Sequence, residues 1–353
     1  MTGPQNRVLI FRLGSIGDTV VALPCFYAIA RVFSSYRRIL LTNSLTSVRA
    51  SPAESVLNGT GLIDEVIYYP VGDFSLKTAV SLISQLRLLR PTVMIYMAER
   101  RSALTVFRDL MFFKAAGVPR IAGSPWTREL RECKILPNTH ELEHESERLA
   151  RTLKGVAPVS LALPNWDLQL SEQELAKADN LLREVAASHA LIAIAPGTKI
   201  AAKQWGADNW AALLKLLSRT FHQVALVVVG APDERMLGDE VSEQWAGPVL
   251  NLCSVLTPRE TAAVLRRCNL LICHDSGPMH LAASQGTKCV ALFGNLNRPR
   301  QWYPYGSGHR VIYEPRGIRE ISVHRVANEI HEALGIDIKG GVLVETTGHQ
   351  KEG

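Results

Sequence analysis

Apolar runs of strand length alternate with longer amphipathic stretches over nearly the whole chain of 353 residues. This alternation is typical of parallel sheets whose strands are joined by crossover helices. Ten runs are expected to form strands, five in each half of the chain: 8–11, 39–42, 66–69, 93–97, 120–122, 191–195, 223–229, 249–252, 270–273 and 289–293. The pattern therefore predicts an α/β protein with two sheets.

A change of composition separates the two halves. Residues 156–167 contain Pro158 and Pro164 and resemble an extended linker, and Ser171-Glu172-Gln173-Glu174 then opens a helix in the manner of a capping box. We expect one domain over residues 1–165 and a second over 166–338, whose last helix can pack back on the first domain. Because the chain is rich in glycine and polar residues from Lys339, residues 339–353 are expected to form a disordered tail.

Composition favours a globular protein with a large core, because 47% of the residues are hydrophobic and 20% are charged. No apolar run reaches the roughly 18 residues that a bilayer crossing requires, and the N-terminus has no signal-peptide pattern. We therefore expect a cytoplasmic protein. The six cysteines form no Cys-x-x-Cys pair, which argues against a disulfide framework and a zinc site and favours reduced core thiols.

The net charge of +6 comes from the first half of the chain. Residues 1–165 hold 20 Lys and Arg against 13 Asp and Glu, a balance of +7, and the remaining 188 hold 19 against 20, a balance of −1. Such a field attracts an anionic partner, although solvated helix faces explain any single arginine equally well. Phe112 and Phe113 are candidates for a membrane-facing patch, but their periodicity favours the core.

The first strand leads into Arg12-Leu13-Gly14-Ser15-Ile16-Gly17-Asp18-Thr19. Gly14 and Gly17 allow a sharp turn or a close approach to a ligand. The Gly-x-Gly-x-x-Gly spacing of a dinucleotide site is absent, which argues against nicotinamide or flavin binding. Asp18 is either a functional carboxylate or a first-turn residue that faces the helix dipole.

Two junctions in the second half hold further polar side chains. Between a strand and a helix, Thr198, Lys199 and Lys203 form a plausible phosphate cradle, without the Gly-Lys-[Ser/Thr] of a Walker loop. Asp233 and Glu234 follow the next strand and either accept hydrogen bonds from ribose hydroxyls or cap a helix.

The most informative segment is His274-Asp275-Ser276-Gly277-Pro278-Met279-His280-Leu281-Ala282-Ala283, which follows an apolar run and opens an apolar helix. In open α/β sheets, ligands bind at the carboxyl ends of strands, and a helix N-terminus favours a phosphate there. The segment therefore indicates an anion site, with a plain helix cap as the alternative.

Three motifs together resemble glycosyltransferase family 9, the ADP-heptose:lipopolysaccharide heptosyltransferase family. They occur in the family's order, at strand-to-helix junctions: Gly14-x-x-Gly17-Asp18, Lys203-x-Trp205, and Asp275-Ser276-Gly277-Pro278-Met279-His280-Leu281-Ala282. The resemblance covers nearly the whole chain, and the last motif is highly specific. It implies a GT-B fold, in which two Rossmann-like domains face each other across a cleft, the first binding the acceptor and the second the nucleotide-sugar.

The resemblance also implies an activity and its residues. The reaction would be inverting transfer of a sugar, heptose from ADP-heptose, to a lipopolysaccharide-core or related glycan, although family members vary in sugar and acceptor. Asp18 is similar to the family's general base and Lys203 to its catalytic phosphate contact. The implied donor site, with residues 252–256 near the base, comprises Thr198, Lys199, Asp233, Glu234, Asp275, Ser276, Gly277 and His280. His280 either touches the ligand or has a structural role, and the implied acceptor contacts are Arg12, Arg100, Arg101 and Arg120.

The chemistry of such a transfer needs a base for the acceptor hydroxyl and positive groups for the departing diphosphate. Asp18 would supply the first, and Lys203, Thr198 and the N–H groups of Ser276-Gly277 the second. Because the sequence contains no Asp-x-Asp triplet, we expect neither a metal nor a cofactor. The apolar Ile200-Ala201-Ala202 departs from the polar loop of many relatives and leaves the donor open.

The expected partners are a nucleotide-sugar and an anionic glycolipid, with peripheral contact at the cytoplasmic face of the inner membrane and no nucleic acid. Two alternatives stay open. A nucleotide-sugar epimerase of the same architecture would surround the sugar with several acids and histidines. A non-catalytic sugar-nucleotide-binding protein would keep the fold alone, and Asp18 argues against it.

Overall fold

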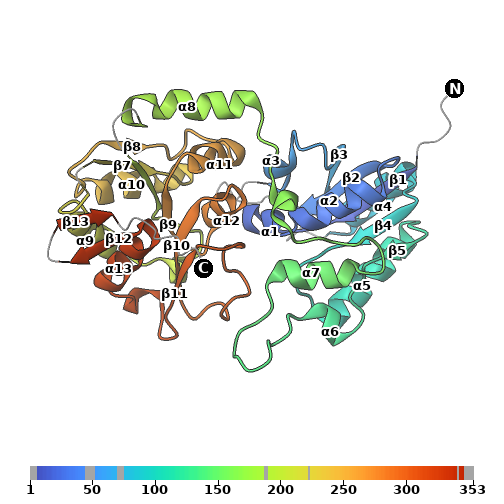
Figure 1. Cartoon of the computed structure of the whole chain (residues 1–353). Coiled ribbons are helices and arrows are strands. Elements are labelled where there is room, and N and C mark those ends of the chain that lie inside the picture. The colour runs from blue at the N-terminus through green and yellow to red at the C-terminus, as the bar shows by residue number, and fades with distance from the viewer. Residues whose placement is uncertain are drawn as a thin grey trace, which may run out of the picture. The chain divides into compact units, whose positions relative to one another are not determined.

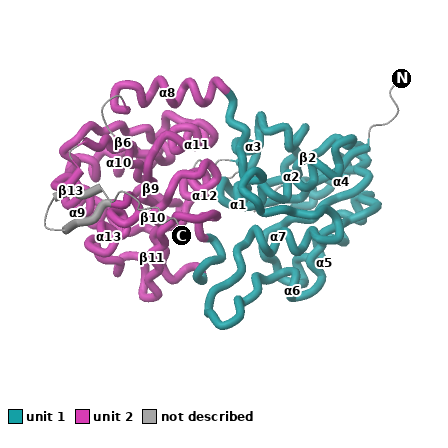
Figure 2. Tube along the Cα trace, viewed as in Figure 1, with its two compact units in different colours: residues 1–171, 298–302 teal, residues 172–297, 303–353 magenta. Residues whose placement is uncertain are grey.

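The computed structural model describes residues 6–43, 52–69, 75–186, 190–221, 223–339 and 342–345. The chain divides into two compact units (Figure 2). Unit 1 consists of Met1–Ser171 and Arg298–Trp302, and unit 2 of Glu172–Asn297 and Tyr303–Gly353. Each unit is built around its own parallel sheet.

The elements of unit 1 follow the predicted alternation of strands and helices (Figure 1). In chain order they are β1 (Arg7–Phe11), α1 (Ile16–Val21), α2 (Leu23–Val32), β2 (Arg37–Asn43), α3 (Glu54–Leu57), β3 (Glu65–Tyr69), α4 (Leu76–Leu89), β4 (Val93–Tyr96), α5 (Ala103–Ala115), β5 (Ile121–Ala122), α6 (Arg128–Arg131), α7 (Glu145–Leu153) and the 3₁₀ helix η1 (Leu163–Trp166).

The sheet of unit 1 has the strand order β3-β2-β1-β4-β5, with every pair parallel. Its strands are apolar on both faces because helices cover both. Side chains of α4 and α5 share one core cluster with Leu9, Phe11 and Met94, and this cluster includes Phe113, as the periodicity predicts. The helices α2 and α7 contribute nothing to that cluster and pack on each other. They therefore belong to the layer on the opposite face.

The elements of unit 2 repeat the plan. They are α8 (Glu172–Ala186), β6 (Ala190–Ala195), η2 (Ala201–Lys203), α9 (Ala207–Leu217), β7 (Val224–Val228), η3 (Pro232–Glu234), α10 (Arg235–Ser242), β8 (Val249–Asn251), α11 (Pro258–Arg266), β9 (Leu270–His274), α12 (Gly277–Ser284), β10 (Lys288–Phe293), β11 (Arg310–Tyr313), η4 (Ile318–Glu320), α13 (Val323–Leu334), β12 (Ile336–Lys339) and β13 (Val342–Glu345).

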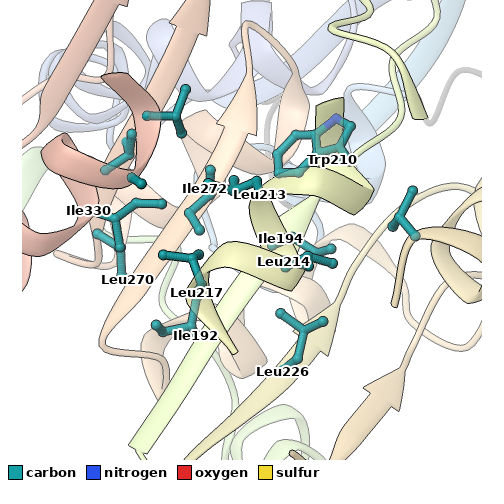
Figure 3. Close-up of a cluster of buried hydrophobic side chains, with 14 of the residues drawn as sticks. Ile192, Ile194, Trp210, Leu213, Leu214, Leu217, Leu226, Leu270, Ile272 and Ile330 are labelled. Atoms are coloured by element: carbon teal, nitrogen blue, oxygen red, sulfur yellow. The ribbon is translucent and has the colours of Figure 1, made fainter. Parts of the chain in front are cut away.

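The second sheet has the order β11-β10-β9-β6-β7-β8. Helix α9 buries residues three and four positions apart, a stripe that fits one face of a helix. Figure 3 shows this stripe over the central strands, with Trp210, Leu213, Leu214 and Leu217 near Ile192, Ile194, Leu270 and Ile272. Helix α13, the last helix of the second domain, packs on α9 and β10 of its own unit.

The boundary between the units falls at 171/172, whereas the composition predicts 165/166. The predicted linker is wrong in its last part, because η1 packs on α2 and buries Trp166. The hydroxyl of Tyr27 donates to the carbonyl of Asp167 at 2.8 Å. Two prolines indicate an extended chain, but they do not reveal that the apolar side chains between them are covered.

Unit 1 also contains the late segment Arg298–Trp302, which lies against the region before and within α7. Backbone N–H groups of Leu142 and Glu145 donate to the carbonyls of Pro299 and Gln301 at 3.1 and 3.0 Å. The guanidinium of Arg300 makes an ion pair of 2.7 Å with Glu147. The sequence gives no indication of this return.

All ten predicted strands are present, and β11, β12 and β13 are additional. The backbones of β12 and β13 pair antiparallel, with β12 ending at Lys339 and β13 lying within the first part of the predicted tail. Residues 340, 341 and 346–353 of the predicted tail lie outside the described residues. All six cysteines are free thiols, as predicted. Within the described ranges, no helix has both the length and the hydrophobicity needed to cross a bilayer.

Candidate functional site

Each sheet has one place where the strand order reverses, and three of the candidate residues follow the strands that flank it. In unit 1 the reversal lies between β1 and β4, and in unit 2 between β6 and β9. At such a switch point the loops after the two strands diverge and leave a crevice at their carboxyl ends, which is where open α/β sheets bind ligands. Asp18 follows β1, Lys203 follows β6 and Asp275 follows β9.

In unit 2 the structure brings together two of the predicted residues. The Nζ of Lys203 lies 2.5 Å from Oδ2 of Asp275, and both side chains are largely buried. The side-chain amide of Asn297, in the loop after β10, donates to the same carboxylate oxygen. Asp275 thereby fixes an ammonium and an amide group at the switch point. Asn297 was not predicted as a site residue.

The loop that carries Lys203 is anchored by a buried histidine. Nε2 of His274 accepts a hydrogen bond of 3.1 Å from the backbone N–H of Trp205. Burial lowers the pKa of His274 to about 4, so the ring is neutral at pH 7 and Nε2 is available as an acceptor. The indole N–H of Trp205 donates to the carbonyl of Ile321 at 2.8 Å. This role of His274 was not predicted, although the residue directly precedes Asp275.

The N-terminus of α12 directly follows Asp275 in the sequence. Ser276 is its N-cap residue with extended backbone, and Gly277 is its first helical residue. The free N–H groups of a first helical turn are suited to an anion. His280 lies one turn further on and is 5% exposed, which places its ring in the interior of the unit.

The remaining donor candidates follow β6 and β7. Thr198 is buried and its carbonyl accepts a hydrogen bond of 3.4 Å from the amide of Gln204, while Lys199 is exposed. The carboxylate of Glu234 accepts from the N–H of Ala231 at 2.8 Å, so Glu234 does cap the 3₁₀ turn. A Cβ built on Gly197 would lie 2.2 Å from Cδ of Glu234. The loops after β6 and β7 therefore meet at this carboxylate.

Asp233 precedes Glu234 in the same turn and is exposed. The segment 252–256, expected near the base, is buried at Leu252 and Cys253 and exposed at Ser254 and Val255. The guanidinium of Arg235 donates to the carbonyl of Cys253 at 3.2 Å. The turn after β7 and the segment after β8 are thus joined.

In unit 1, Asp18 lies in the first turn of α1. Its Oδ2 accepts hydrogen bonds from the N–H and hydroxyl of Ser15, at 2.8 and 3.1 Å. Among the residues that the structure describes, no hydrogen bond uses Oδ1, and the side chain is 21% exposed. Asp18 therefore caps the helix through Oδ2, while its Oδ1 lies 4.0 Å from the guanidinium of Arg12.

The side chain of Asp18 leaves no room for a side chain at Gly14, the residue before this turn. Gly14 has a φ of +135°, and a Cβ built on it would lie 2.4 Å from Cβ of Asp18. Its N–H donates to the side chain of Asn43 at 2.7 Å. Gly17 lies inside the first turn of α1. Only Gly14 of the two therefore needs the conformational freedom of glycine.

Arg12 was predicted to contact the acceptor, but its side chain is completely buried. Its guanidinium donates to the carbonyls of Asp18 and Met97, at 2.7 and 3.0 Å. A group that is covered on all sides and bound to backbone carbonyls holds the protein together and does not meet a ligand from solvent. We therefore reinterpret Arg12 as a positioning residue.

The other three arginines that were predicted to contact the acceptor do not lie together. Arg101 makes an ion pair of 2.7 Å with the buried Asp109, and Arg100 is exposed beside Glu132 at 3.4 Å. Both follow β4 and lie near the carboxyl edge. Arg120 does not, because its carbonyl accepts from the N–H of Met94 at the beginning of β4. It lies toward the amino edge of the sheet, away from Asp18.

Glu99 is a carboxylate that sequence reasoning missed. It follows β4, the strand next to β1, and the negative charge of Asp18 acts on it. Loss of hydration, and then the Asp18 charge, raise the pKa of Glu99 above its ordinary value. The sequence shows that Glu99 follows a strand, but it does not show the strand order that makes β4 the neighbour of β1.

Comparison with known proteins decides the family. The sequence model of glycosyltransferase family 9 (heptosyltransferase) matches residues 113–326, more than half of the chain. The chain belongs to glycosyltransferase family 9. Membership makes it a glycosyltransferase and favours this activity over the epimerase alternative. The match includes Lys203 and Asp275 but begins after Asp18.

Similar proteins support this family assignment. The chain is 29% identical over 247 residues to lipopolysaccharide heptosyltransferase 2 of Escherichia coli K12, a match that covers 64% of this chain and 69% of that protein. It resembles the crystal structure of the family 9 glycosyltransferase from Veillonella parvula, with a TM-score of 0.73 and 18% identity over 95% of this chain and 98% of that one.

The E. coli heptosyltransferase WaaC with ADP-2-deoxy-2-fluoro heptose gives a TM-score of 0.64 and 17% identity, over 92% of this chain and 99% of that one. At these identities the likeness shows the fold, which is the GT-B fold that the motifs predict.

Proposed function

We propose that this family 9 glycosyltransferase transfers heptose from ADP-heptose to a lipopolysaccharide-core or related glycan. The observation that carries the proposal is the cluster of Lys203, Asp275 and Asn297 at the switch point of unit 2, in the chain next to the N-terminus of α12. The relatives named above support the choice of sugar, nucleotide and acceptor, since one is a lipopolysaccharide heptosyltransferase and another carries an ADP-heptose analogue.

The donor diphosphate would bind in unit 2. An ammonium group has three N–H donors, so Lys203 can keep its contact with Asp275 and still direct a proton toward a phosphate oxygen. The free N–H groups at Ser276-Gly277 would add helix-end hydrogen bonds. Thr198 and Lys199 would complete the phosphate cradle, and Asp233 or Glu234 would accept from the ribose hydroxyls. His280, one turn into α12, remains a candidate for a further contact with the donor.

The acceptor would bind in unit 1, with Asp18 as the general base. The proton of the acceptor hydroxyl moves to Oδ1 of Asp18 while the acceptor oxygen forms a bond to the anomeric carbon of the sugar. The bond between that carbon and the diphosphate oxygen breaks, and its electron pair leaves with ADP. Because attack and departure occur on opposite sides, the anomeric configuration inverts. Lys203 and the α12 N–H groups stabilise the negative charge that develops on the diphosphate.

The basic first half of the chain supports an anionic glycolipid acceptor, since its balance of +7 attracts phosphate-bearing or acidic sugars. Such an acceptor sits in a membrane, so we also propose peripheral contact with the cytoplasmic face of the inner membrane. Arg100 and Arg101, near the end of β4, are the remaining candidates for acceptor contacts.

The test is a transfer assay with the full chain, ADP-heptose and a lipopolysaccharide-core acceptor. We expect ADP release that depends on the acceptor and a product whose mass increases by one heptose. A parallel thermal-shift panel of ADP-, UDP- and GDP-sugars should show the largest stabilisation with the ADP-sugar. ADP release that is independent of the acceptor, or selective stabilisation by a UDP-sugar, would contradict the proposal.

A further inference from the structure

The outer side of the helical layer formed by α4 and α5 in unit 1 exposes an unusual number of large apolar side chains. The two helices are neighbours, because both pack into one core cluster and the guanidinium of Arg87 on α4 donates to the carbonyl of Ala115 at 3.0 Å. The exposed apolar side chains on them are Leu76, Val80, Leu88, Leu104, Phe107 and Met111. We call this surface the α4–α5 face.

The exposed side chains on α5 follow helical spacing. Leu104, Phe107 and Met111 lie three and four residues apart, and they are 81%, 55% and 55% exposed. The buried side of the same helix carries Val106 and Phe113. An ordinary surface helix presents polar residues opposite its buried stripe. Helix α5 presents apolar side chains on both sides, so its outer side is suited to a partner rather than to water alone.

The charges on this face have one sign. Helix α4 contains no acidic residue, and the single acidic residue of α5, Asp109, is buried. The exposed charged residues of the two helices are Lys77, Arg87, Arg108 and Lys114. A surface that combines exposed apolar side chains with cations alone is the combination that binds the interface of an anionic bilayer, where side chains enter the boundary of the acyl chains and cations meet lipid phosphates.

We propose that the α4–α5 face is a docking surface for an anionic lipid bilayer. Charge decides the occupant, because the exposed charged groups of both helices are all cations and the phosphates of an anionic bilayer are complementary to them. The side chains that enter the interface are Leu104, Phe107 and Met111, not the Phe112 and Phe113 singled out by the sequence, since Phe113 is buried and Phe112 is partly buried in the core. This assignment does not rest on the proposed sugar or acceptor, and it explains how the enzyme would reach a substrate held in a membrane.

The test is co-sedimentation of the full chain with vesicles of phosphatidylcholine, with and without phosphatidylglycerol, in the absence of any sugar donor or acceptor. We expect binding to the vesicles that contain phosphatidylglycerol, and a decrease of that binding as ionic strength rises. Equal binding to both vesicles, or none to either, would overturn the proposal. Because no glycolipid is present, failure here leaves the proposed transfer reaction unaffected.

Variants locate the surface. Leu104→Ser with Phe107→Ser should weaken vesicle binding by about tenfold or more, because both side chains lose their apolar contact with the interface. The matched control is Leu163→Ser with Met236→Ser, which removes two side chains that are 66% and 84% exposed on η1 and α10. We expect the control to bind as the unchanged chain does. Equal losses in the two double variants would contradict the assignment to this face.

A charge variant and a measurement of mass complete the test. Lys77→Gln with Lys114→Gln should lower binding to the anionic vesicles, whereas Lys154→Gln with Lys215→Gln, which removes two exposed lysines elsewhere, should not. Analytical ultracentrifugation without lipid identifies the competing occupant. If the Leu104→Ser, Phe107→Ser variant converts a dimer into a monomer and leaves vesicle binding unchanged, the face is a contact between copies of this chain and the proposal is wrong.

Discussion

The buried guanidinium of Arg12 donates a hydrogen bond of 2.7 Å to the backbone carbonyl of Asp18. A second hydrogen bond, of 3.0 Å, runs to the carbonyl of Met97, two residues before Glu99. One side chain thereby holds the beginning of α1 against the end of β4, the two segments that flank the switch point of unit 1. The positions of both carboxylates at this edge depend on a residue that touches neither solvent nor ligand.

Replacing Arg12 by lysine should separate these two segments. A lysine keeps the charge, but its single nitrogen cannot reproduce the planar fork that reaches two carbonyls. We expect the free energy of unfolding to fall by about 1–3 kcal/mol, because one buried carbonyl loses its partner. Urea denaturation measures this, and Arg31→Lys, at an exposed position on α2, is the control. Equal stability of the two variants would show that Arg12 is dispensable.

Asp18→Asn and Lys203→Ala should fail in different ways. Asparagine can still accept from Ser15, so α1 keeps its cap, but the proton acceptor is lost and transfer should slow by roughly 10² to 10⁴. Donor affinity should change little. Lys203→Ala should weaken ADP binding and slow transfer together, since the ammonium would contact the diphosphate in both the ground and transition states. Calorimetry with ADP and steady-state kinetics distinguish them. If Asp18→Asn weakens ADP binding as strongly as Lys203→Ala does, Asp18 is not the base.

Chelation should leave turnover almost unchanged. The proposed charge stabilisation comes from Lys203 and the N-terminus of α12, and the sequence has no Asp-x-Asp motif for a metal–diphosphate complex. Initial rates measured with EDTA should agree with those in buffer. Loss of activity in EDTA that is restored by Mg²⁺ or Mn²⁺ would show that a cation takes part.

The neutral state of His274 should make stability depend on pH. The pKa of His274 is about 4 in the folded chain and has an ordinary value of 6.5. Between these values the unfolded chain binds a proton that the folded chain does not, so the free energy of unfolding falls as pH drops from 6.5 to 4, by up to about 3 kcal/mol.

The variant His274→Gln isolates this contribution. Glutamine can still accept from Trp205 but does not titrate, so its unfolding free energy should change less over this pH range. His324→Gln, at an exposed position on α13, should keep the pH dependence of the unchanged chain. Denaturant titrations at several pH values provide the comparison. Parallel pH profiles for His274→Gln and the unchanged chain would rule out His274 as the cause.

Gly14→Ala should impair transfer through Asp18. The new Cβ would lie 2.4 Å from Cβ of Asp18, and the φ of +135° is strained for any L side chain. We expect a loss of stability of about 1–3 kcal/mol and a lower kcat, with ADP affinity unchanged. Gly155→Ala is the control, because a Cβ there meets nothing within 4 Å. Normal kcat in Gly14→Ala would show that Asp18 tolerates displacement.

The sequence was sufficient for the elements that have a strong pattern. Continuous apolar runs identified the strands, as in Val224–Val228, where every residue is buried. It was less informative about contacts between distant segments. The pairing of Lys203 with Asp275 follows from the adjacency of β6 and β9, which no local pattern encodes. Arg12 was misassigned for a similar reason. A charged residue after a strand is expected to be exposed, and its hydrogen bonds to distant backbone carbonyls cannot be predicted from local sequence. Asn297 and Glu99 were missed because an isolated polar residue after a strand has no distinctive spacing.

The return of Arg298–Trp302 to unit 1 determines when unit 1 can finish folding during synthesis of the chain. Most of unit 1 leaves the ribosome first. Its Glu147 has no Arg300, and the backbone of Leu142 and Glu145 has no Pro299 or Gln301, until residues 172–297 of unit 2 have been translated. The first unit to emerge is thus completed only after residues 172–297 of unit 2 have been made. A nascent chain arrested before residue 298 should hold α7 less firmly than the finished protein does, and late arrest points should protect this region from proteases where early ones do not.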